Sequence, residues 1–186
     1  GNNPLVANIA SAVSVCAIVR PAVIADSGIV DQTGTGDATN SKFLLFLETS
    51  LYRWRIGPEL TTIVFATAPV AGRLVSLGGT FDDAANTMAA YVDGQLDAIN
   101  TAITASMAAT VTGNLLIGQL GSDVYPWNGH ISCVYIWARV LRAMDMAQLH
   151  AEPYAFLLSQ SPSVKYFLPT ASAGIVPLRM LMGVGL

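Results

Sequence analysis

The stretch from Thr80 to Asp97 reads TFDDAANTMAAYVDGQLD, and it predicts strand, polar turn, strand, tight turn and strand in succession. Asp93 and Gly94 give its sharpest signal. A two-residue type I′ turn needs positive φ at both central positions, which Asp tolerates and Gly prefers. Ahead of this turn, residues 88–92 (MAAYV) alternate with the period of a pleated strand. The stretch therefore predicts antiparallel strands joined by tight turns.

Similar patterns recur along the rest of the chain. Alternating residues predict a strand from Val13 to Arg20, and Pro21 ends it because proline has no N–H for a ladder. Further strands are predicted at 27–31, 42–48, 52–56, 60–67, 73–79, 114–118, 129–139 and 164–168. The segments 101–112 and 119–128 are predicted to be an irregular crossing and a loop, and a short helix is predicted at 144–150. Turn signals about every eight to twelve residues indicate an all-β sandwich or barrel.

The composition is apolar and poor in charge. Hydrophobic residues make up 53% of the chain and charged residues 11%, against roughly 25% charged in soluble domains. We expect other subunits to cover much of this surface; the alternative is a monomer with a surface of Ser, Thr, Asn and Gln. The net charge of −3 and the absence of a basic patch argue against a nucleic-acid partner. Arg53 and Arg55, which flank Trp54, are interpreted as a solvated face.

The sequence gives no sign of a membrane span or of a zinc site. It has no run of about 18 apolar residues, and its two His and two Cys have no close spacing. Cys16 and Cys133 each lie in an alternating apolar run, which predicts small core residues. A disulfide between them, on adjacent strands, is left open.

The residues do not indicate catalysis. Glycosidases on such sandwiches use two carboxylates across a cleft, and Glu48, Glu59 and Glu152, the only glutamates, lack such a partner. His130 and His150 are predicted at a strand start and a helix end, and no Gly-x-Ser-x-Gly accompanies them. We therefore expect no enzyme, no catalytic residues, and structural roles for both histidines.

Calcium was considered because carboxylates and carbonyls in loops can bind it. The candidates, all in or near predicted loops, are Asp26, Asp31, Asp37, Asp82, Asp83 and Asp123. None has a ligand spacing such as Asp-x-Asp-x-Asp. The interpretation favoured is solvated turn residues, so no metal or other cofactor is predicted, with Ca²⁺ as the alternative.

Six short motifs occur in order: GTFD at 79–82, YVDG at 91–94, LIG at 116–118, WNGHI at 127–131, VYIWARVL at 134–141 and MAQL at 146–149. Through them, the chain resembles the concanavalin A-like, laminin G-like family over residues 13–154. The resemblance implies a jelly-roll sandwich of two antiparallel sheets. It also makes calcium at the sandwich rim an option.

The chain departs from the family pattern at two places. Arg142 and Asp145 stand near the positions of the usual Ser or Thr cap and Glu, so we expect a less well capped helix start. The family's first strand, ahead of Val13, is missing. We expect either the apolar tail or a neighbouring subunit to cover that sheet edge.

The predicted domains are a laminin G-like β-sandwich at 1–158 and an apolar C-terminal arm at 159–186. The last residues, 174–186, carry Ile, Val, Leu and Met with one charge, Arg179. Because an exposed apolar arm would aggregate, we expect it to pack on this domain or to dock on a neighbouring subunit, and docking is the preferred alternative.

Two functions follow from these observations. The first is a non-catalytic structural protein, a phage virion component such as a capsid decoration protein, whose partners are copies of itself or capsid subunits. The second is a carbohydrate-binding, lectin-like adhesion module, secreted or at the cell surface, that binds glycans through rim loops. Its candidate site is Tyr125, Trp127 and Asn128, because sugars stack on aromatic rings and bond to amides. For the rings of Trp127 and Trp137, a role as core or rim plugs is preferred to that of a sugar platform. Of these two functions, the structural role is the preferred prediction.

Overall fold

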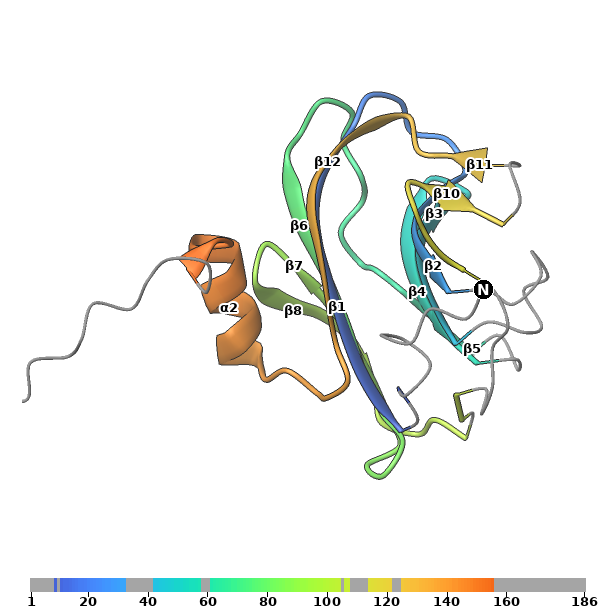
Figure 1. Cartoon of the computed structure of the whole chain (residues 1–186), viewed down its shortest axis with the longest axis vertical. Helices are drawn as coiled ribbons and strands as arrows, with labels where there is room; N and C mark the ends of the chain where they lie inside the picture. Colours follow the sequence, from blue (N-terminus) through green and yellow to red (C-terminus); the bar gives the residue numbers. More distant parts are fainter. Residues whose placement is uncertain are drawn as a thin grey trace, which may run out of the picture. The chain divides into compact units, whose positions relative to one another are not determined.

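The computed structural model describes residues 9, 11–32, 42–57, 61–104, 106–107, 114–121 and 125–155. These residues form two five-stranded antiparallel sheets, a two-stranded hairpin and the helix α2 (Ala143–Ala151). Figure 1 shows the two sheets facing each other, with α2 on the outer side of one of them.

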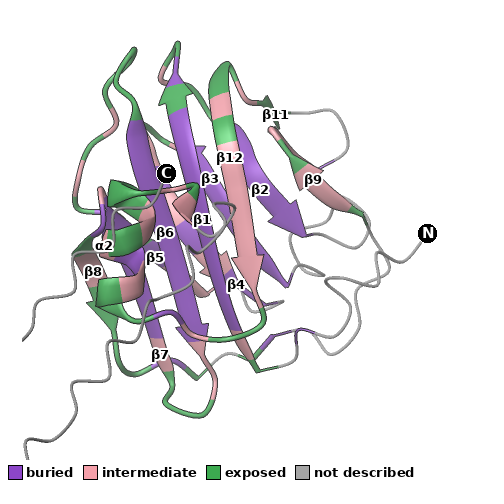
Figure 2. Cartoon of the chain, turned by 60° about the vertical axis from the view of Figure 1, so that its left-hand side comes forward, coloured by how far each residue is buried: buried purple, intermediate pink, exposed green. Residues whose placement is uncertain are grey.

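The sheet that carries α2, here the helix-bearing sheet, has the strand order β12-β1-β6-β7-β8. Its strands are β1 (Ala12–Pro21), β6 (Val75–Asp82), β7 (Thr87–Val92), β8 (Gln95–Asn100) and β12 (Gly129–Trp137). Figure 2 shows β1 and β6 buried along most of their length, whereas β12 at the sheet edge is intermediate or exposed.

The second sheet, here the hairpin-bearing sheet, has the order β5-β4-β3-β2-β9. Its strands are β2 (Ser27–Gln32), β3 (Phe43–Glu48), β4 (Leu51–Ile56), β5 (Thr61–Val64) and β9 (Leu115–Ile117). A short hairpin of β10 (Gln119–Leu120) and β11 (Tyr125–Pro126) packs beside β2. The predicted all-β, two-sheet antiparallel sandwich with one short helix is confirmed.

The main core fills the space between the sheets, as the alternation of residues predicts. On β4, Tyr52, Trp54 and Ile56 are buried in this core, and the two arginines between them point the other way. On β1, Val13, Val15, Ala17 and Val19 join the same cluster. Alternate residues of each strand therefore form one continuous apolar layer.

Trp54 connects the two sheets at the centre of this layer. Its side chain is fully buried, and its Nε1–H donates a hydrogen bond to the carbonyl oxygen of Thr80, 3.1 Å away on β6. A Cβ atom at Gly79 would lie 2.4 Å from Cδ2 of the indole. The ring thus occupies the space that any side chain at Gly79 would need.

The turn between β7 and β8 has the predicted form. Asp93 has φ +49° and Gly94 has φ +78°, so both central residues take the left-handed conformation of a type I′ turn. A Cβ at Gly94 would lie 2.8 Å from Cα of Ala147, because the turn packs directly against α2. The glycine therefore serves both the turn and the helix contact.

The helix packs on the outer face of its sheet through a second apolar cluster. This cluster consists of Cys16, Ala89, Tyr91, Leu141 and Met146, with Tyr135, Trp137 and Leu149 packed against it. The side chain of Arg142 makes no capping hydrogen bond, but the backbone N–H of Arg142 donates to Asp145 Oδ2 at 2.9 Å. This backbone bond lowers the pKa of Asp145. The helix start therefore lacks a side-chain cap at Arg142, in line with the expected weaker capping, and has the bond from its backbone N–H to Asp145.

Three predictions about local structure need correction or fall outside the described residues. The predicted loop 119–128 contains the β10–β11 pair. The predicted buried strand 114–118 is a half-exposed edge strand, with Ile117 55% exposed. The predicted strand 164–168 and the arm 159–186 lie outside the described residues, so the domain boundary and the arm's docking remain predictions.

The two cysteines lie on the adjacent strands β1 and β12. Cys16 is buried, as predicted, whereas Cys133 is only half-buried. Both are free thiols, so the disulfide left open by the sequence is not formed. In the described part of the chain, no helix is long and apolar enough to cross a membrane.

Substituting Gly79→Ala should destabilise the fold by about 1–3 kcal/mol or more, because the added methyl overlaps the Trp54 indole. Gly78→Ala is the matched control on the same strand, since its Cβ would meet the flexible Met146 side chain at 3.1 Å and Tyr91 Cβ at 3.3 Å. Urea unfolding measures both. Equal costs for the two variants would contradict the assigned role of Trp54.

Burial raises the pKa of the Cys16 thiol from 9.0 to about 11. The unfolded chain ionises this thiol from about pH 9, whereas the folded chain keeps it neutral. Its contribution to stability is therefore complete below pH 9 and is lost between pH 9 and 11, by up to about 1.4 kcal/mol per pH unit. Denaturant unfolding across this range should show a shallower loss in Cys16→Ala than in the wild-type chain. Cys133→Ala keeps Cys16 and its burial, the largest cause of the raised pKa, so its slope should stay close to that of the wild-type chain.

Candidate functional site

The segment between β11 and β12 contains the three residues that the sequence selects for glycan binding. Tyr125, on β11, is 45% exposed, and Asn128 is exposed just before β12 begins. Trp127, between them, is half-buried and packs against the main core. The structure thus places all three on one rim segment, with Tyr125 and Asn128 the two that face solvent most.

Trp127 acts mainly as a plug beneath this segment. Its backbone N–H donates to the carbonyl of Gly118 at 2.8 Å, which fixes the approach to β12. Its indole Nε1 is buried and has no hydrogen-bond partner among the described residues. Packing against the core favours the prediction of a rim plug over a sugar platform for this ring.

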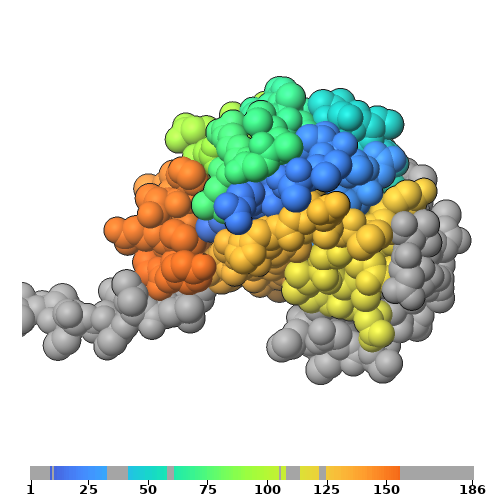
Figure 3. All heavy atoms as spheres, turned by 90° about the horizontal axis from the view of Figure 1, so that it is seen from above, coloured from blue at the N-terminus to red at the C-terminus, as the bar shows by residue number. Residues whose placement is uncertain are grey.

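A shallow hollow of about 430 Å³ lies next to Asn128. It is lined by Arg20, Pro21, Ala22, Gly72, Gly129 and His130, and we call it the rim hollow. Two backbone hydrogen bonds hold its wall: Ala22 N–H donates to the carbonyl of Asn128 at 2.8 Å, and Gly72 N–H donates to the carbonyl of Pro21 at 2.7 Å. Figure 3, seen from above, shows the blue end of β1 between the green segment near residue 72 and the yellow-orange start of β12.

Strand register places two polar side chains at the rim hollow. Arg20 on β1 is directly opposite His130 on β12, and both are exposed. A Cβ at Gly129 would lie 2.3 Å from the carbonyl oxygen of Arg20, so the two strands meet closely only because residue 129 is glycine. Arg20 is not among the residues predicted for this site; the signal that could have found it is a charged residue at the end of an apolar strand.

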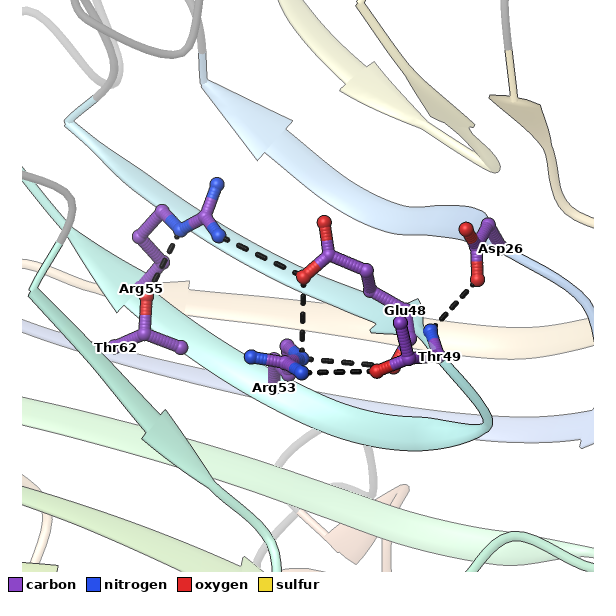
Figure 4. A network of polar contacts seen from close by, with 6 residues as sticks. All are labelled: Asp26, Glu48, Thr49, Arg53, Arg55 and Thr62. Atoms are coloured by element: carbon purple, nitrogen blue, oxygen red, sulfur yellow. Dashed lines mark hydrogen bonds and ion pairs between the residues drawn. The ribbon is translucent and has the colours of Figure 1, made fainter.

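The arginines of β4 belong to a separate polar network on the outer face of the hairpin-bearing sheet (Figure 4). Arg53 Nε is 3.2 Å and Arg55 Nη2 is 3.9 Å from Glu48 Oε2. Arg55 also donates to Thr62 Oγ1 at 2.9 Å and stacks 4.6 Å above the Phe46 ring. Burial lowers the pKa of Arg55. The two arginine side chains are only 22% and 15% exposed, and Arg55 covers Phe46, which corrects the prediction of a solvated face.

Three of the six candidate calcium ligands accept hydrogen bonds from backbone N–H groups. Asp26 accepts the N–H of Thr49 at 2.7 Å, and Asp82 accepts the N–H of Ala85 at 3.1 Å, as turn residues do. Asp31, the second-last residue of β2, is fully buried and accepts the N–H of Gly121 at 2.7 Å, so the interpretation as a solvated turn residue is wrong for it. Asp37 and Asp123 lie outside the described residues. Across the described ranges, no three His, Cys, Asp or Glu residues form a group that could hold a metal ion.

The histidines lie where the sequence predicts. His130 is the second residue of β12, and His150 is in the last turn of α2, with Nδ1 3.9 Å from Asp93 Oδ1. Of the glutamates, Glu48 pairs with the β4 arginines and Glu59 lies outside the described residues. Whether the chain catalyses a reaction is untested, and the expectation of no enzyme stays a prediction.

Two facing antiparallel sheets around an apolar core, with polar groups at the rim and on the outer faces, define a jelly-roll β-sandwich. A model of the concanavalin A-like lectin/glucanases superfamily, of laminin G type, matches residues 2–147. The chain therefore belongs to this superfamily, and the resemblance found in the sequence is confirmed.

Solved structures agree with this fold. The sialidase CBM40 of Ruminococcus gnavus, bound to α2,3-sialyllactose, aligns with TM-score 0.63 and 15% identity over 76% of this chain and 83% of that one. Domain 4 of the arabinanase AbnA from Geobacillus stearothermophilus, in complex with arabinotriose, aligns with TM-score 0.59 and 15% identity over 76% and 67%. A heptameric SAP-like pentraxin from Limulus polyphemus aligns with TM-score 0.60 and 14% identity over 76% and 71%.

A search of curated proteins gave no match. At identities of 14–15%, the similarity to these solved structures establishes the fold alone. The assignment of Tyr125, Trp127 and Asn128 to a binding site therefore rests on this chain's own geometry and stays a prediction.

Proposed function

We propose that this domain is a non-catalytic carbohydrate-binding module whose sugar-contacting surface is the rim from Tyr125 to His130. The observation that carries this proposal is an exposed aromatic ring on the same short segment as an exposed amide, beside a shallow hollow of about 430 Å³. Apolar surface with a few convergent polar groups is the usual composition of a small-molecule site.

Each rim residue has a distinct role in this proposal. The Tyr125 ring provides an apolar face for the C–H face of a sugar ring. The Asn128 amide both donates to and accepts from hydroxyls, and Arg20 and His130 add hydrogen bonds from the hollow. Trp127 lies under the segment and positions it, rather than contacting the sugar directly.

The rim segment is held in place before any ligand arrives. The β10–β11 pairing fixes Tyr125 opposite Leu120. Backbone hydrogen bonds fix Trp127 to Gly118 and Asn128 to Ala22. A binding surface with a fixed backbone loses less conformational entropy when it binds. Because the hollow is shallow, we expect each copy to bind weakly and several copies to act together.

The comparisons support sugar binding without choosing a sugar. One similar structure is bound to sialyllactose and another to arabinotriose, which are an acidic and a neutral oligosaccharide. These two ligands are bound by those proteins. For this chain, an oligosaccharide ligand is our proposal. A secreted or cell-surface location goes with this proposal.

The structural role placed first by the sequence is now the second candidate. None of the three similar structures described above is a virion protein by its description. The virion location, the capsid partners and the docking arm therefore stay predictions of the sequence. The observation that still favours an assembly is the charged fraction of 11% in the whole chain.

A glycan array probed with the full chain, in calcium and in chelator, should give binding to a defined set of glycans. Tyr125→Ala should weaken binding to the best glycan about tenfold or more, because the stacking surface is lost. Leu96→Ala, which truncates a side chain 52% exposed on β8, is the surface control and should bind as the wild-type chain does. An array without binding in either buffer, or equal affinity of Tyr125→Ala and wild type, would contradict the proposal.

A further inference from the structure

A second hollow, of about 220 Å³, lies where α2 ends against the helix-bearing sheet. Among its lining residues are Leu74, Asp93, Ser132, His150, Pro153 and Tyr154, and we call it the helix-end hollow. It shares no lining residue with the rim hollow. At about 30 Å³ for each water molecule, it holds the volume of about seven waters, enough for one small ring.

A β-bulge brings Ser132 to this hollow. Ile18 on β1 is opposite Cys133 on β12, but the next residue, Val19, is opposite Ile131. Ser132 is therefore the extra residue of the bulge and is exposed. Bulges redirect side chains and occur often beside functional sites. Its hydroxyl can both donate and accept.

Asp93 presents a carboxylate that the protein holds in place. Oδ1 accepts the N–H of Ser76 at 3.0 Å, and Oδ2 lies 2.5 Å from Arg73 Nη2. A carboxylate accepts up to four hydrogen bonds through its two oxygens, so both oxygens retain capacity for a ligand. The Asp93 side chain is 27% exposed and lines the hollow, so a ligand there can reach the carboxylate.

His150 faces Asp93 across a gap that neither side chain closes. Its Nδ1 lies 3.9 Å from Asp93 Oδ1, which is beyond a hydrogen bond. A hydroxyl group placed beside both side chains could bond to the two at once, as a bridging water does. This spacing suits a ligand that is rich in hydroxyl groups.

Tyr154 adds an aromatic surface, since its side chain is 48% exposed. The segment that carries it is anchored, because the Tyr135 hydroxyl donates to the carbonyl of Pro153 at 2.8 Å. Leu74, 57% exposed, adds apolar surface from the start of β6. The hollow thus combines an aromatic ring, an aliphatic side chain and three polar side chains.

We propose that the helix-end hollow binds one neutral monosaccharide unit, as a second sugar site separate from the rim. Hydroxyls of the ring donate to Asp93 and bond to Ser132 and His150, while the ring lies against Tyr154. A neutral sugar is favoured because Arg73 and Asp93 form an ion pair and offset each other's charge, so the hollow offers a charged ligand of either sign little net attraction. The choice of a sugar as the ligand rests on the proposed function, whereas the location of the binding site in the helix-end hollow does not.

The test is a titration of the ¹⁵N-labelled full chain, followed by amide chemical shifts, with glucose, galactose, mannose and N-acetylglucosamine. N-acetylneuraminic acid serves as the acidic control. At least one neutral sugar should shift the amides of Ser132, Asp93 and His150, and the acidic sugar should not. Tyr154→Ala should weaken this binding about tenfold, and Ser132→Ala, at an exposed position, should weaken it severalfold. The spectrum of each variant shows directly whether it is folded.

The rim variant separates this inference from the proposed function. Tyr125→Ala should leave the shifts at the helix-end hollow unchanged. Shifts confined to the rim would overturn the inference and support the proposed function. Shifts at the hollow alone would support the inference and contradict the rim site. An absence of shifts with all four neutral sugars, or shifts that persist unchanged in both Tyr154→Ala and Ser132→Ala, would overturn the inference.

Discussion

The contact between the Trp54 indole and the backbone of Gly79 is the constraint on which this sandwich depends. The ring belongs to one sheet, its hydrogen-bond acceptor, the Thr80 carbonyl, belongs to the other, and no side chain at residue 79 separates them. Truncation of a fully buried aromatic side chain typically costs about 3–5 kcal/mol, a large share of the stability of a single domain. Because this contact sets how closely the sheets approach, it also sets where the loops at the ends of the sandwich lie.

A packed apolar core leaves the rim and the outer faces as the places where polar chemistry can occur. Several charges on these surfaces pair locally: Glu48 with the β4 arginines, Arg73 with Asp93, and Asp145 with the start of α2. Surface ion pairs of this kind contribute little to global stability, but they hold turns and helix ends in position. The surfaces that remain available to a ligand are hollows with hydrogen-bonded backbone walls and exposed aromatic rings.

The sequence predicted those features that depend on local patterns. Alternation located the main strands, and the pair Asp93 and Gly94 predicted its turn because only a few residues tolerate positive φ. The β10–β11 pair was missed because a strand of two residues has no period to detect. The opposition of Arg20 to His130 and the bulge at Ser132 depend on strand register between distant segments. Neighbouring residues do not determine that register, so the candidate site could be predicted only as a stretch of chain.

We propose that the rim of the sandwich, rather than a sheet face, recognises a sugar. The most direct measurement is a crystal structure of the chain with an oligosaccharide that binds it. The account predicts a sugar ring stacked on Tyr125 with hydroxyls within hydrogen-bond distance of the Asn128 amide, and an unchanged Trp127 beneath it. An oligosaccharide bound on the outer face of β3, β4 and β5, with the Glu48–Arg53–Arg55 network broken to admit it, would contradict the account.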